Sequence, residues 1–208
     1  MSSGSTVLGD AADGGATTAT ISPVKAGMLA FLLSDVAFFS ALISTYVVFL
    51  RDTKASDPGP AQVFKDDMPL MWAATICLLA SSVTIHLAEG ALRRGGRESF
   101  LGFWGLTILL GATFLACTAK EWYRLINHFG LTISRNMFGS TFFTLVGFHA
   151  AHVTVGLIIL SIIWLLAWRR DISKQNPTGV EVASWYWHFV DGVWIVVFSL
   201  VYLVSVYG

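Results

Sequence analysis

The stretch Met28–Leu50, MLAFLLSDVAFFSALISTYVVFL, determines the class of fold. It is apolar almost throughout, and it is as long as the roughly 20 helical residues that cross the hydrocarbon core of a bilayer. Its one charged residue is Asp35, and a charge at the centre of a membrane helix costs about 2.5–3.5 kcal/mol on insertion scales. Asp35 therefore needs a partner, a function or a neutral form.

The whole chain has the composition of a membrane protein. Of its 208 residues 55% are hydrophobic and 12% charged, whereas soluble domains carry about 25% charged residues. The formal net charge is zero, so no basic field attracts a nucleic-acid partner. The long apolar runs cover residues 26–50, 69–92, 100–119, 137–168 and 185–207. The sequence therefore predicts an all-α polytopic membrane protein, a bundle of five transmembrane helices over residues 26–208.

The ends and loops of the chain predict its orientation. Residues 1–25 are rich in Gly, Ala, Ser and Thr, and we expect a flexible polar N-terminal tail. The second and fourth loops read RRGGRES and RRDISKQNP, and both are dominated by arginine and lysine. Because positive loops stay inside, the N-terminus is predicted to be cytoplasmic and the C-terminus periplasmic.

Several other polar residues interrupt the apolar runs, and we expect them to form a polar face that fixes helix packing. They are His86, Glu89, Glu121, His149, His152, His188 and Asp191. The pair His149–His152 lies on one helix face and could ligate haem, but no second histidine pair matches it, so interhelical hydrogen bonds are favoured and no metal site is predicted. For Asp35, a proton-linked or lipid-linked role and a structural role both stay open.

Motifs in these runs carry a family resemblance. FGSTFFTLVGFHAAHVTVGLIIL (Phe138–Leu160) and ASWYWHFVDGVWIVVFSLVYL (Ala183–Leu203) resemble the two C-terminal spans of subunit III of haem–copper terminal oxidases. GMLAFLLSDVAFF is similar to another helix of that family, in which glutamate usually stands where this chain has Asp35. The chain is similar to the short five-helix bacterial form, because two N-terminal helices of the seven-helix form have no counterpart here.

The resemblance implies a non-redox accessory subunit of a proton-pumping oxidase of aerobic respiration, of the cytochrome c oxidase type, in the bacterial inner membrane. It implies no catalytic centre and no cofactor in this chain, with haem and copper held by partner subunits. Subunit I would be the main contact, beside subunit II and other oxidase subunits. It also implies bound phospholipid, with Arg169 and Arg170 at the level of lipid head groups.

The sequence leaves alternatives open both within this family and outside it. Within the family, the chain could serve a quinol oxidase or a nitric-oxide-reductase system, because the electron donor docks on other subunits. Outside the family, a free-standing proton-coupled carrier predicts activity in vesicles without any oxidase. A small membrane cytochrome b predicts a haem spectrum from this chain alone.

Overall fold

The computed structural model describes residues 22–65, 67–169 and 178–207, and in these ranges every regular element is a helix. The long helices are α1 (Pro23–Val48), α4 (Met68–Arg93), α5 (Arg97–Phe129), α6 (Met137–Trp168) and α7 (Thr178–Phe198). Short helices α2 (Leu50–Ala55) and α3 (Pro60–Phe64) join α1 to α4, and a π-helix, η1 (Ser199–Val204), continues α7 into α8 (Ser205–Tyr207). Within the described residues five helices are long and apolar enough to cross a membrane, which confirms the predicted fold class.

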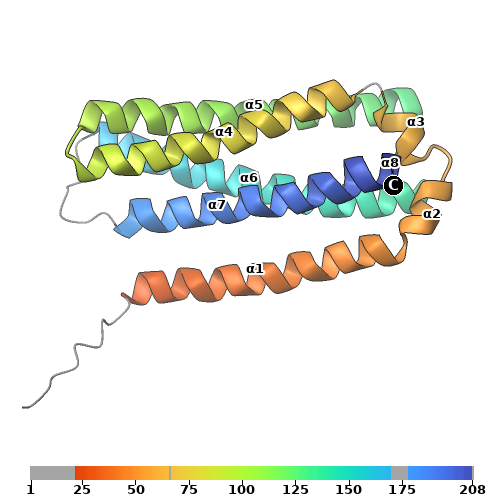
Figure 1. The fold of residues 1–208 in the computed structure, drawn as a ribbon, viewed down its shortest axis with the longest axis horizontal. Helices are drawn as coiled ribbons and strands as arrows, with labels where there is room; N and C mark the ends of the chain where they lie inside the picture. Colours follow the sequence, from red (N-terminus) through yellow and green to blue (C-terminus); the bar gives the residue numbers. More distant parts are fainter. Residues whose placement is uncertain (1–21, 66, 170–177, 208) are drawn as a thin grey trace, which may run out of the picture.

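The long helices lie side by side in one bundle (Figure 1). Helices α4 and α5 pair closely along one side, α6 and α7 lie next to them, and α1 lies at the opposite edge against α6 and α7. Helices α2 and α3 gather with α8 at one end of the bundle. Helix α1 is consequently the most peripheral: the residues that it buries are Asp35, Phe39 and Tyr46.

Local sequence signals account for the helix ends. Helix α1 starts with Pro23 directly after Ser22, whose hydroxyl accepts a hydrogen bond from the backbone N–H of Lys25 at 3.4 Å. Asn136 caps α6 by accepting from the N–H of Gly139 at 2.8 Å. Helix α5 ends at Phe129, and the next residue, Gly130, adopts the left-handed conformation (φ +58°) that glycine tolerates without a steric penalty.

Three helices extend beyond the predicted spans. Helix α1 begins at Pro23, inside the predicted tail, and α7 begins seven residues before Trp185. Helix α5 continues ten residues past the predicted end at 119, because its polar last turns are held to the bundle by contacts of Glu121 and Arg124. Residues 1–21 of the predicted tail lie outside the described ranges.

Aromatic side chains fill the centre of the bundle. The indole of Trp194 stacks on the ring of His149 (centroids 4.8 Å apart) and meets Phe114 edge-on. Its N–H donates to the hydroxyl of Thr75 at 3.0 Å, and the indole N–H of Trp187 donates to the hydroxyl of Ser81 at 2.8 Å. Both bonds join α7 to α4, so the two helices are held by hydrogen bonds as well as by packing.

A second pair of indoles joins α5 to α6. Trp104 on α5 donates to the carbonyl of Leu160 on α6 at 2.9 Å, and Trp164 on α6 donates to the carbonyl of Leu101 on α5 at 3.0 Å. The reciprocal arrangement satisfies both indole N–H groups, that of the buried Trp104 and that of the partly buried Trp164, where lipid could not.

Candidate functional site: a carboxyl–histidine pair between α1 and α6

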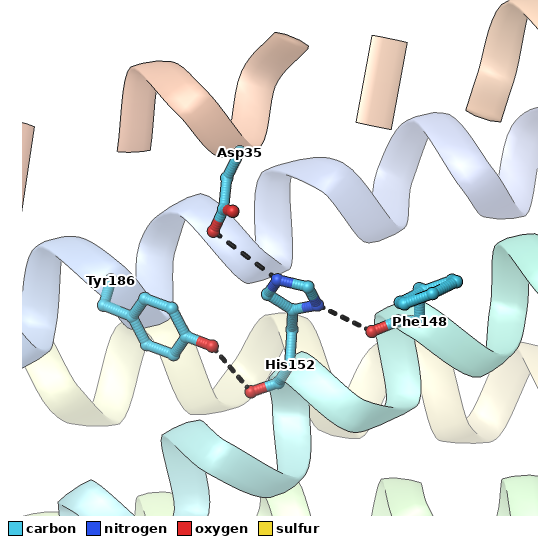
Figure 2. Close-up of polar contacts among 4 residues, drawn as sticks. All are labelled: Asp35, Phe148, His152 and Tyr186. Carbon is cyan, nitrogen blue, oxygen red and sulfur yellow. Dashed lines mark hydrogen bonds and ion pairs between the residues drawn. The ribbon is translucent and has the colours of Figure 1, made fainter. Parts of the chain in front are cut away.

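Asp35 lies at the middle of α1 and points into the bundle. The residue is 8% exposed, although most of its neighbours along α1 face outward. Its Oδ2 lies 3.5 Å from Nε2 of His152, which is at the middle of α6 (Figure 2). The residue that the sequence singled out as a charge in an apolar run therefore has an ionisable partner on another helix.

The second ring nitrogen of His152 fixes the orientation of the imidazole. Nδ1 lies 2.7 Å from the backbone carbonyl oxygen of Phe148, one helical turn earlier (Figure 2). A carbonyl oxygen only accepts, so Nδ1 carries the hydrogen and donates it. Nε2 is thereby left to face Asp35.

Aromatic groups from α1 and α7 surround the pair. The hydroxyl of Tyr186 on α7 donates to the backbone carbonyl of His152 at 2.9 Å (Figure 2). Phe39, one turn after Asp35, packs edge-on against the imidazole with centroids 4.9 Å apart. Helices α1, α6 and α7 thus meet at this one point, and the pair lies in a largely apolar environment.

This geometry limits the proton content of the pair. With Nδ1 committed as a donor, Nε2 either carries a proton beside an ionised Asp35 or accepts from a protonated Asp35. Both arrangements are neutral overall. A lone carboxylate beside a neutral imidazole would leave an uncompensated charge in the apolar interior, which is costly. Either arrangement leaves no net charge in the apolar interior.

The remaining predicted residues do not gather around Asp35. His149, three residues before His152 and turned by about 60° round α6, is fully buried between Phe114 and Trp194. Neither ring nitrogen of His149 has a hydrogen-bond partner among the described residues. Its role in this structure is that of a packed aromatic ring.

His188 and Asp191 face α4 instead of α1. The hydroxyl of Ser82 lies 3.1 Å from Nδ1 of His188 and donates a short hydrogen bond to Oδ2 of Asp191. His86 is exposed and Glu89 is partly exposed, one and two turns after Ser82 on the same helix. These residues form a second polar cluster, between α4 and α7.

Glu121 belongs to a third cluster, near the end of the bundle that holds α8. It is 1% exposed and accepts a hydrogen bond from the hydroxyl of Tyr202 at 2.8 Å. One turn later Arg124 pairs with the buried Asp67 at the start of α4. The two contacts hold the last turns of α5 against α4 and η1.

Of the two arginines predicted at the level of lipid head groups, the structure describes one. Arg169 follows the last residue of α6 and is exposed, while Arg170 lies outside the described residues. Arg97 at the start of α5 donates to the carbonyls of Ala167 and Trp168, at 3.2 and 2.7 Å. No group of three or more His, Cys, Asp or Glu side chains is placed to hold a metal ion in the part of the chain that the structure describes.

Sequence reasoning missed the hydroxyl groups that complete these clusters. Tyr186, Ser82 and Tyr202 each supply one hydrogen bond to a predicted residue from a different helix. A single Ser or Tyr in an apolar run has no distinctive spacing, so no sequence signal marked these three. The pairing of Lys25 with Glu181 at 2.8 Å, which joins α1 to α7, was also missed.

The fold and its interhelical polar contacts define an all-helical, multi-pass membrane protein. The family model described as cytochrome c oxidase subunit III matches residues 5–206, nearly the whole chain. This chain belongs to the cytochrome c oxidase subunit III family.

Curated relatives agree with this assignment. The chain is 36% identical to the cytochrome bo(3) ubiquinol oxidase subunit 3 of Pseudomonas aeruginosa, over 86% of this chain and 84% of that protein. It is 36% identical to the cytochrome c oxidase subunit 3 of Bacillus subtilis, over 88% and 86%. The quinol oxidase subunit 3 of Bacillus subtilis is 34% identical over 88% and 87%. The relatives are thus subunits of terminal oxidases, which are oxidoreductase complexes.

Proposed function

We propose that this chain is a non-redox accessory subunit of a proton-pumping haem–copper oxidase in the bacterial inner membrane. Haem and copper are held by its partners, and the chain packs on subunit I, where it supports proton uptake and the stability of the complex during turnover. The family assignment carries the proposal. The Asp35–His152 pair supports its proton-linked part, because it brings two ionisable groups to within 3.5 Å of each other at the middle of two membrane helices.

The electron donor of the complex is cytochrome c in this proposal. The description of the family model and the subunit of Bacillus subtilis at 36% identity support this choice. A quinol oxidase is the second candidate, favoured by the equally similar relative from Pseudomonas aeruginosa. An assay of the purified complex with each electron donor distinguishes the two candidates. Oxidation of reduced cytochrome c but not of a water-soluble ubiquinol supports the first candidate. Oxidation of the ubiquinol but not of cytochrome c supports the second.

Bound phospholipid also belongs to the proposed function. A cavity of about 220 Å³ between α1 and α6 is lined largely by apolar side chains, among them Leu42, Phe49 and Leu145. Such a lining suits an acyl chain. The exposed Arg169 lies at the end of α6 that the positive-inside rule places in the cytoplasm, at the level of lipid phosphates.

The proposal is tested by comparing the oxidase with and without this chain. Each preparation is reconstituted in vesicles, and the number of turnovers before activity is lost is measured together with proton uptake. The proposal predicts that the enzyme without the chain keeps its haem spectrum and its initial activity, but takes up protons more slowly and inactivates after fewer turnovers. Adding the chain back restores both properties. Unchanged proton uptake and turnover number without the chain would contradict it.

A further inference from the structure

Polar residues mark the outer face of the bundle between α4 and α7. On α4, Ser82, His86 and Glu89 are four and three residues apart, so they lie along one stripe of the helix. On α7, His188 approaches this stripe through Ser82 at 3.1 Å and lies within electrostatic range of His86 and Glu89. The two histidines are exposed on the surface of the chain, and Glu89 is partly exposed.

This polar stripe lies deeper in the membrane than the lipid head groups. If the middle of each helix marks the middle of the membrane, His86 on α4 and His188 on α7–α8 lie roughly 7–8 Å from that plane at 1.5 Å per residue. The hydrocarbon core extends about 15 Å to each side of it. Both imidazoles therefore lie well inside the hydrocarbon region, with Glu89 nearer its edge.

The surroundings of the stripe are apolar. The exposed side chains near it on α4 include Ile76 (62%), Leu79 (37%) and Val83 (61%), and on α7 Ile195 is 49% exposed. An acyl chain offers no hydrogen-bond partner, so imidazole and carboxyl groups that face lipid here would stay unsatisfied. Neither His86 nor Glu89 has a hydrogen bond or ion pair to another described residue.

A glycine lies within the same face. On α7, His188, Gly192 and Ile195 follow a spacing of four and three, and on α4 Leu79, Val83 and His86 follow the same spacing. These are the seams along which helices pack against one another. A β-carbon at Gly192 would meet nothing within 4 Å, so packing within the chain does not require a small residue there. Small residues on membrane helices let a partner backbone approach closely.

We infer that the α4–α7 face, defined by His86, Glu89, His188, Gly192 and Ile195, is the surface on which a transmembrane helix of another oxidase subunit packs. The partner helix crosses α7 at Gly192 and presents hydrogen-bonding side chains at the depth of the two histidines, with a cationic group opposite Glu89. This inference rests on the proposed function, which supplies the partner, and assigns the contact to one face of the bundle.

The chemistry of the α4–α7 face argues against two other occupants, a lipid phosphate and a second copy of this chain. A lipid phosphate would lie too far out to reach the imidazoles. The cavity of about 330 Å³ beside Glu89 is also lined by Arg93 and by Glu181, which pairs with Lys25, so a phosphate held there would leave both imidazoles without a partner. A second copy related by a two-fold axis along the membrane normal would bring both copies of Glu89 to the same depth, with like charges facing each other. A different chain with complementary groups avoids both conflicts.

The test uses the whole oxidase and two matched pairs of variants. Gly192→Leu is compared with Gly102→Leu, because Gly102 on α5 is also exposed with open space in front of it. The amount of chain that co-purifies with tagged subunit I is measured for each, at equal levels of the chain in the membrane. We expect Gly192→Leu to lower it about tenfold, which corresponds to a penalty of about 1.4 kcal/mol, and Gly102→Leu to leave it unchanged.

Photo-crosslinking provides a second readout that does not depend on a disruptive substitution. Benzoylphenylalanine replaces either Ile195 or Leu106 on α5, two large apolar residues that are 49% and 40% exposed. The inference predicts a protein adduct with another oxidase subunit from position 195 and a lower yield from position 106. Adducts from position 195 to lipid alone or to a second copy, or full retention of Gly192→Leu, would overturn it while the proposed function stands. Loss of the unsubstituted chain from the purified oxidase would instead overturn the proposed function.

Discussion

Asparagine and leucine at position 35 separate the structural role of the carboxyl group from its proton-linked role. Asp35→Asn keeps the size of the side chain, and its amide N–H can donate to Nε2 of a neutral His152, whose Nδ1 remains bonded to the carbonyl of Phe148. Unlike the carboxyl group, the amide cannot take up or release a proton. Asp35→Leu removes the contact as well and leaves Nε2 facing an apolar side chain.

The magnitude follows from the contact that is lost. Interhelical polar contacts in membranes contribute about 0.6 kcal/mol on average and at most about 1.7 kcal/mol. The 3.5 Å separation of Oδ2 and Nε2 is long for a hydrogen bond, so this pair should contribute less than that maximum. We therefore expect Asp35→Leu to lower the free energy of unfolding of the detergent-solubilised chain by about 1 kcal/mol, and Asp35→Asn to change it by less than about 0.5 kcal/mol.

The functional readout is the number of turnovers that the assembled oxidase completes before it inactivates. Both variants should lower this number several-fold, because neither has a group at position 35 that can take up and release a proton. A wild-type number for Asp35→Asn, together with the expected loss of stability in Asp35→Leu, would show that the carboxyl group is structural only. Equal loss of stability in both variants would refute the hydrogen bond from the amide to His152.

Three further predictions concern stability, each measured as the unfolding midpoint of the purified chain in detergent. Glu121→Leu leaves the buried hydroxyl of Tyr202 without its acceptor and should lower the free energy of unfolding by about 1–3 kcal/mol. Glu121→Gln keeps an acceptor oxygen and should lower it much less. Equal losses in the two variants would contradict the hydrogen bond from Tyr202 to Glu121. Trp104→Phe removes the N–H that bonds a backbone carbonyl of α6, for a loss of about 1 kcal/mol, and no loss would mean that the bond does not hold α5 to α6. In Gly111→Ala the new β-carbon would lie 2.7 Å from a ring carbon of a buried α7 tryptophan, so overpacking should cost about 1–3 kcal/mol; the control Gly102→Ala, with open space in front of it, should cost nothing.

Hydropathy predicted the membrane helices well because the bilayer sets their length and forbids other lipid-exposed structures. It placed the end of the third span at 119, since Lys120 and Glu121 begin a polar segment. The helix continues to Phe129 because partners on η1 and α4 satisfy that segment. Hydropathy averaged over a short segment contains no information about partners that lie far away in the sequence.

The candidate site, too, was predictable from the sequence only in part. The sequence singled out Asp35 and His152 individually, as ionisable groups in apolar runs, but their pairing depends on how α1 lies against α6. His149 and His152 were expected to share one polar face with Asp35. Three residues along a helix turn the side chain by about 60°, and that turn directs His149 into the aromatic core while His152 reaches α1. Helix periodicity gives the direction of a side chain, and only tertiary packing gives its neighbour.

The most direct test of the account is to tag this chain, purify it in mild detergent, and record the visible spectrum and the co-purifying proteins together. The account predicts that haem–copper subunits I and II co-purify with the chain and that all haem absorbance follows subunit I when the subunits are separated. A single colourless chain, active in vesicles without any oxidase, would contradict it and support a proton-coupled carrier. A single chain that itself carries haem would contradict it in favour of a membrane cytochrome.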